Sequence, residues 1–107
     1  MTTTKNLDTT TFDAVTQSGV SLIDFYADWC GPCRALAPTV EELAVKHGET
    51  ATIAKVDVDA NSSLAQRFGV RSIPTVVALK DGQEVERLTG RVSLEVLEEL
   101  LERAEKA

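Results

Sequence analysis

The sequence predicts an α/β sandwich, in which helices cover a mixed β-sheet. Strand-like apolar runs alternate with helix-like runs between residues 20 and 69, an order typical of parallel strands that helices connect. Asp81 and Gly82 then separate two more strand-like runs by two residues, a strong hairpin signal that adds antiparallel strands. With 107 residues, of which 43% are hydrophobic, the chain is expected to form one domain over residues 1–107.

The N-terminal part of the sequence predicts a short helix followed by a central strand. Asp8 or one of residues 9–11 caps the helix, which runs through Gln17. The strand covers residues 20–27. Its apolar side chains lie on both faces, which indicates a central strand that is covered on both sides. Asp24, in the middle, is the one charged residue of this run.

A long helix over residues 33–47 and a second buried strand over residues 51–59 follow. Apolar residues recur at helical spacing on one face of the helix, and Pro38 within this pattern predicts a kink. Asn61 or Ser62 then caps a short helix.

The C-terminal part predicts an antiparallel hairpin and an amphipathic helix. The hairpin strands cover residues 75–80 and 83–88. The helix covers about residues 93–106, with leucines on one face and glutamates on the other. We expect its leucine face to cover the sheet.

Composition and charge exclude several classes of protein. The formal net charge of −6 argues against binding to nucleic acid, because the chain has no basic patch to displace counterions. Residues 1–5 lack the apolar run of a secretion signal, and no run approaches the roughly 20 apolar residues that span a bilayer. Both cysteines lie in one motif rather than in a framework of bridges, as is typical of a reducing compartment. We therefore expect a soluble, cytoplasmic protein with no membrane partner, and by default a monomer.

The two cysteines of the chain, Cys30 and Cys33, lie at the junction between the central strand and the long helix. Unpaired N–H groups and the helix dipole stabilise an anion such as a thiolate in the first turn. Residues three apart share a helix face, so the two sulfurs can form and open a disulfide. If Cys30 is the N-cap, its sulfur accepts from the N–H of Cys33 at the exposed end of the helix, which makes Cys30 the nucleophile. Cys33 is expected to be more buried and to act as the resolving thiol.

A metal site, a structural bridge and chance each account less well for the cysteine pair. A zinc site needs four ligands, and outside the pair the sequence offers no cysteine and one histidine, His47, so we expect no metal. A purely structural disulfide would close too short a loop to constrain the unfolded chain much. A chance pair of buried thiols would not require Gly31 and Pro32 between them.

Several motifs in order closely resemble the thioredoxin family over essentially the whole chain. These are the run from Trp29 to Cys33 after an Asp-bearing strand, then Ile73-Pro74-Thr75 before a hairpin, and Gly90 beyond it. The resemblance implies a thioredoxin fold, with a central mixed sheet of about five strands and about four helices in three layers. It also implies a protein-disulfide reductase with no cofactor beyond its own disulfide. Its partners would be disulfide-containing proteins and a flavin-containing, NADPH-dependent thioredoxin reductase.

The resemblance also implies a role for individual residues. Cys30 is similar to the attacking thiol, Cys33 to the resolving thiol, and Asp24 to the buried carboxylate that assists proton transfer at Cys33. Lys55 resembles the partner of that aspartate, although its alternation with Asp57 and Asp59 is also typical of a solvated face. The substrate surface would comprise Trp29, Gly31, Pro32, Ile73, Pro74 and Gly90, with Pro74 in the cis form. Three residues depart from common family patterns: Tyr26 replaces Trp, Ser72 replaces Gly, and Arg34 replaces Lys.

Three functions from different classes remain open at this point. The first is a dithiol reductant of protein disulfides, favoured because Gly31 and Pro32 add no donor or charge that would stabilise the reduced form further. The second is an oxidase or isomerase on the same fold. The third is a non-catalytic binding subunit that uses the surface around Trp29 and Pro74 to hold a partner.

Overall fold

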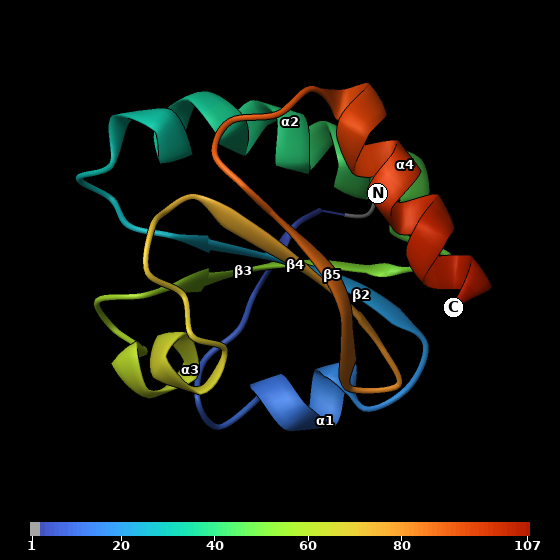
Figure 1. Cartoon of the computed structure of the whole chain (residues 1–107), viewed down its shortest axis with the longest axis horizontal. Helices are drawn as coiled ribbons and strands as arrows, with labels where there is room; N and C mark the ends of the chain where they lie inside the picture. The colour runs from blue at the N-terminus through green and yellow to red at the C-terminus, as the bar shows by residue number, and fades with distance from the viewer. Residues whose placement is uncertain (1–2) are drawn as a thin grey trace.

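A five-stranded sheet and four helices make up the part of the chain that the computed structural model describes, residues 3–107 (Figure 1). The strands are β1 (Lys5–Asn6), β2 (Val20–Tyr26), β3 (Thr52–Asp57), β4 (Thr75–Lys80) and β5 (Gln83–Thr89). The helices are α1 (Phe12–Thr16), α2 (Gly31–His47), α3 (Ser62–Arg67) and α4 (Leu94–Lys106). The predicted α/β architecture is confirmed.

The strands run in the order β1-β3-β2-β4-β5, which places β2 at the centre of the sheet. β1 and β2 both pair parallel with β3, whereas β2 with β4 and β4 with β5 are antiparallel pairs. The sheet is therefore mixed, as predicted. Asp81 and Gly82 both have positive φ, which matches the two-residue turn between β4 and β5.

The sheet separates two apolar layers. Helices α2 and α4 cover one face, and α1 and α3 cover the other (Figure 1). Successive residues of β2 alternate between the layers: Leu22 packs with the α2 and α4 side, and Ile23 packs with the α1 and α3 side. Because both faces are covered, Asp24 is only 4% exposed although it carries a carboxyl group.

Three elements differ from the sequence prediction by more than one residue. β1 was not predicted, because it has only two exposed residues and exists through its pairing with β3. The strand expected over residues 51–59 ends at Asp57, and residues 58–60 form a turn. The long helix begins at Gly31 rather than Cys33 and continues through Pro38. The expectation for residues 1–5 includes Met1 and Thr2, which lie outside the described residues.

No helix within residues 3–107 is both long enough and apolar enough to cross a bilayer.

The N-cap of α4 is a testable stabilising contact. Ser93 Oγ accepts a hydrogen bond from the backbone N–H of Val96 at 3.3 Å. Ser93→Ala leaves this N–H without its acceptor, so we expect a loss of about 1 kcal/mol in the free energy of unfolding, measured with urea. Ser93→Asp is the matched control, since its carboxylate can accept the same bond. Equal losses in both variants would contradict a capping role for this side chain.

Candidate active site

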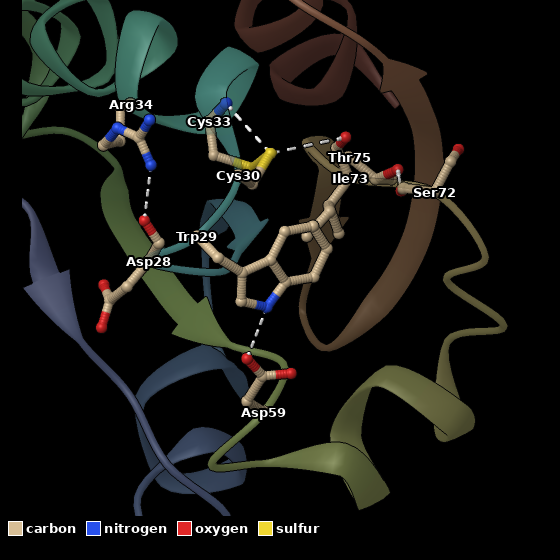
Figure 2. The surroundings of a disulfide bond; sticks show 9 residues. All are labelled: Asp28, Trp29, Cys30, Cys33, Arg34, Asp59, Ser72, Ile73 and Thr75. Carbon is tan, nitrogen blue, oxygen red and sulfur yellow. Dashed lines mark hydrogen bonds between the residues drawn. A yellow bond between two sulfur atoms is a disulfide. The ribbon is translucent and has the colours of Figure 1, made fainter.

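Cys30 and Cys33 form a disulfide at the N-terminus of α2 (Figure 2). Cys30 is the N-cap, and its Sγ accepts from the backbone N–H of Cys33 at 3.2 Å, as predicted. The Cα atoms of the pair are 5.2 Å apart, within the usual range for a disulfide. Pro32, in the first turn, has no N–H to compete for the sulfur. The helix start therefore holds both sulfurs where a thiolate on Cys30 is stabilised.

The predicted difference in burial between the two cysteines is wrong. Cys30 is 4% exposed and Cys33 is 3% exposed, because both pack with Ala27 and against Ile73. The cysteines differ instead in their surroundings. Cys30 lines a groove on the outside of the molecule, whereas Cys33 lines a cavity that it shares with Asp24.

The outer groove has a volume of about 590 Å³ and lies between the start of α2, α3 and the loop before β4. Four residues predicted for the substrate surface line it: Trp29, Gly31, Pro32 and Ile73. Trp29 is 68% exposed, and its indole Nε1–H donates to Asp59 Oδ2 at 2.8 Å (Figure 2). An exposed indole held by a hydrogen bond is a rigid apolar wall for a binding partner.

Sequence reasoning missed part of this groove. Val58, Ala65 and Val70 form much of its apolar wall, and Asp59 fixes the indole of Trp29. The alternation of charged residues up to Asp59 indicated a solvated strand face, but Asp59 lies in the turn after β3. No local pattern identifies these residues, because the groove brings the start of α2 together with α3 and the turn after β3, which are distant in the sequence.

Pro74 and Gly90 are not among the residues that line the groove. Pro74 is buried, and the Ile73–Pro74 peptide bond is cis. Gly90 has φ +94° and donates its N–H to the carbonyl of Pro74 at 2.8 Å, a conformation that favours glycine. The carbonyl oxygen of Ile73 is 3.8 Å from Cys30 Sγ (Figure 2). This loop therefore presents backbone next to the disulfide.

Asp24 and Cys33 line the same inner cavity, of about 170 Å³. Burial raises the pKa of Asp24 from an ordinary 3.8 to about 7, and the positive charge of Lys55 opposes this increase. Oδ1 of Asp24 is buried and has no hydrogen-bond partner among residues 3–107. A carboxyl group that titrates near neutral pH beside a thiol can exchange a proton with it.

Lys55 lies directly opposite Asp24 in the parallel pair of β2 and β3. It is half-buried and lines the inner cavity, so its side chain is only partly exposed to solvent. Among the described residues, no Lys55–Asp24 ion pair within 4.0 Å is present. Its Nζ lies instead 5.4 Å from the centre of the Tyr26 ring. Lys55 thus acts on Asp24 through its charge at a distance.

Arg34 also lines the inner cavity. Its Nη1 donates to the carbonyl oxygen of Asp28 at 2.8 Å, which joins α2 to the segment before it (Figure 2).

No cluster of three or more His, Cys, Asp or Glu side chains that could hold a metal occurs within residues 3–107.

Comparisons with known proteins agree with this geometry. The family model described as Thioredoxin matches residues 3–103. A thioredoxin from Staphylococcus aureus (strain Mu50) is 48% identical over 92 residues, which are 86% of this chain and 88% of that protein. The structure of a mutant thioredoxin from Halobacterium salinarum NRC-1 is similar, with a TM-score of 0.90 and 42% identity over 98% of this chain and 93% of that chain. For the thioredoxin of Malassezia sympodialis the TM-score is 0.89 and the identity 31%, with the same coverage. With its cysteine pair at a helix N-terminus beside an apolar groove, this chain belongs to the thioredoxin family of thiol-disulfide oxidoreductases.

Proposed function

We propose that this protein is a cytoplasmic dithiol reductant of protein disulfides, with Cys30 as the nucleophile and Cys33 as the resolving thiol. The main support is the placement of Cys30 as the N-cap of α2 on the wall of the outer groove. A substrate that enters this groove meets Cys30 first, whereas Cys33 lies on the inner cavity.

The first step is attack by the Cys30 thiolate on a substrate disulfide. The N–H of Cys33 and the N-terminus of α2 stabilise this thiolate. Trp29, Gly31, Pro32 and Ile73 contact the substrate segment, while the hydrogen bond from Gly90 to Pro74 supports the loop that carries Ile73. Attack forms a mixed disulfide and releases the first substrate thiolate, which takes a proton from water.

The second step is attack by Cys33 on the sulfur of Cys30. Asp24 accepts the proton of Cys33 across the inner cavity, and Lys55 favours the ionised form of Asp24 that can accept it. The Cys30–Cys33 disulfide forms and the second substrate thiolate leaves.

A flavin-containing, NADPH-dependent thioredoxin reductase would then restore the dithiol. We infer that residues 1–107 act as a single thioredoxin domain and as a monomer, with the Cys30–Cys33 pair as the redox centre and no other cofactor or metal. With its net charge of −6, the chain is not expected to bind nucleic acid.

The equilibrium of the Cys30–Cys33 pair in glutathione buffers tests the direction of the reaction. We expect a potential of about −270 mV, the value characteristic of thioredoxins as a class. A potential near about −120 mV would contradict the reductant and favour an oxidase. If a variant that lacks both cysteines keeps full activity, this result would instead favour the non-catalytic binding subunit.

A further inference from the structure

A second cavity is also lined by Asp24 but not by Cys33. It has a volume of about 320 Å³ and shares Asp24, Arg34 and Lys55 with the inner cavity. Only the inner cavity is lined by Cys33, and only the second is lined by Thr4 and Glu41. Asp24 therefore lies between a cavity that contains the thiol and a cavity that contains another carboxylate.

The polar groups of the second cavity are suited to hold water. Two of the three buried side-chain oxygens without a partner in residues 3–107 belong to residues on its wall: Thr4 Oγ1 and Asp24 Oδ1. Buried polar atoms of this kind are usually satisfied by water, and the volume has room for several molecules. Glu41 is half-buried, and the backbone N–H of Thr4 lies within hydrogen-bond distance of its two carboxylate oxygens, at 3.3 and 3.4 Å. Its carboxylate is thereby held between the cavity and solvent.

Asp28 also lines the inner cavity and carries a carboxylate, so a proton on Asp24 has two possible routes to solvent. The charged groups around Asp24 are Lys55 on β3, Arg34 and Glu41 on α2, and Asp28 before α2. Asp28 is exposed, but its cavity also contains Cys33, the group from which the proton comes. Glu41 lines the second cavity, which has no cysteine on its wall.

We propose that Glu41 is a proton-release residue, which takes the proton from Asp24 through the second cavity and passes it to solvent. This inference rests on the proposed function. When the Cys33 S–H bond breaks, its proton moves to Asp24, the Cys30–Cys33 bond forms, and the bond from Cys30 to the substrate sulfur breaks. The substrate thiolate takes a proton from water, and Asp24 returns one through Glu41. The substrate disulfide gains the two electrons that the dithiol loses, so no other reactant is needed.

The direct test measures how fast Asp24 exchanges its proton with solvent in the oxidised protein. The line width of the Asp24 carboxyl carbon in NMR spectra near pH 7, where the group titrates, reports this rate. We expect Glu41→Gln to slow exchange by about fivefold, less than the roughly 100-fold effect of a group that transfers the reacting proton itself. Thr4→Val changes no charge but makes one cavity wall apolar, and it should also slow the proton exchange of Asp24. Glu42→Gln, on the same helix but exposed, is the matched charge control and should leave the rate unchanged.

Three outcomes would overturn the proposal: unchanged exchange in Glu41→Gln, equal slowing in Glu42→Gln, or slowing in Asp28→Asn alone, which would assign the exit to the inner cavity.

A second measurement uses stopped-flow reduction of a protein disulfide. Glu41→Gln should delay proton release to an indicator in weak buffer, recover in strong buffer, and have no further effect in the Asp24→Asn background. A delay of the same size in the Asp24→Asn background would also overturn it. If Asp24→Asn reacts at the wild-type rate, the proposed function of Asp24 fails, whereas the NMR result still decides the exit path.

Discussion

Cys33→Ser is expected to accumulate covalent complexes with protein substrates and to stop turnover after one attack. Cys30 keeps the N–H of residue 33 and its place on the outer groove, so it can still attack a disulfide. The serine hydroxyl cannot resolve the mixed disulfide, because a thiolate is required for exchange. Non-reducing electrophoresis after mixing with a disulfide-containing protein measures the trapped complex.

Cys30→Ser is the matched control and should trap no complex. Both cysteines are almost equally buried, so the expected difference depends on which cavity each one lines rather than on its exposed fraction. Equal trapping by the two variants would show that either thiol can act as nucleophile and would contradict the assigned roles.

Asp24→Asn is expected to stabilise the fold at neutral and alkaline pH while it slows disulfide reduction. Desolvation raises the pKa of Asp24 to about 7, above its value of about 3.9 in an unfolded chain. The folded state therefore binds more protons between these values, and the wild-type protein loses stability as pH rises from about 4 to about 7. Above about pH 7 this loss is constant, because Asp24 is ionised in both states.

The expected gain from Asp24→Asn follows from this difference. About three pH units at about 1.4 kcal/mol each give up to about 4 kcal/mol in the free energy of unfolding above about pH 7, with little gain below about pH 4. The amide cannot accept the proton of Cys33, so the reaction slows, by about 100-fold if Asp24 is the general base. Urea unfolding across pH, together with rates of disulfide reduction, measures both effects. A variant that is less stable at neutral pH, or equally fast, would identify Asp24 as a structural ion-pair residue.

Much of the fold could be predicted from the sequence because its signals are local. The alternating runs around β2, the turn at Asp81 and Gly82, and the leucine face of α4 each depend on side chains close together in the chain. The cysteine spacing likewise predicted the N-cap contact, in which Cys30 Sγ accepts from the N–H of Cys33. Asp24 could be identified as anomalous because a charged residue interrupts an apolar strand.

The sequence by itself thus determined the order of the elements after β1 and the chemistry of the cysteine pair, while the tertiary structure decided the surroundings of each sulfur. β1 exists only through its pairing with β3, and the groove combines α2 with Val58, Ala65 and Val70. The equal burial of Cys30 and Cys33 results from packing with Ile73, which follows Cys30 by 43 residues in the chain. Periodicity reflects each segment's own side chains, whereas cavities and burial depend on how distant segments pack, and no local pattern encodes that packing.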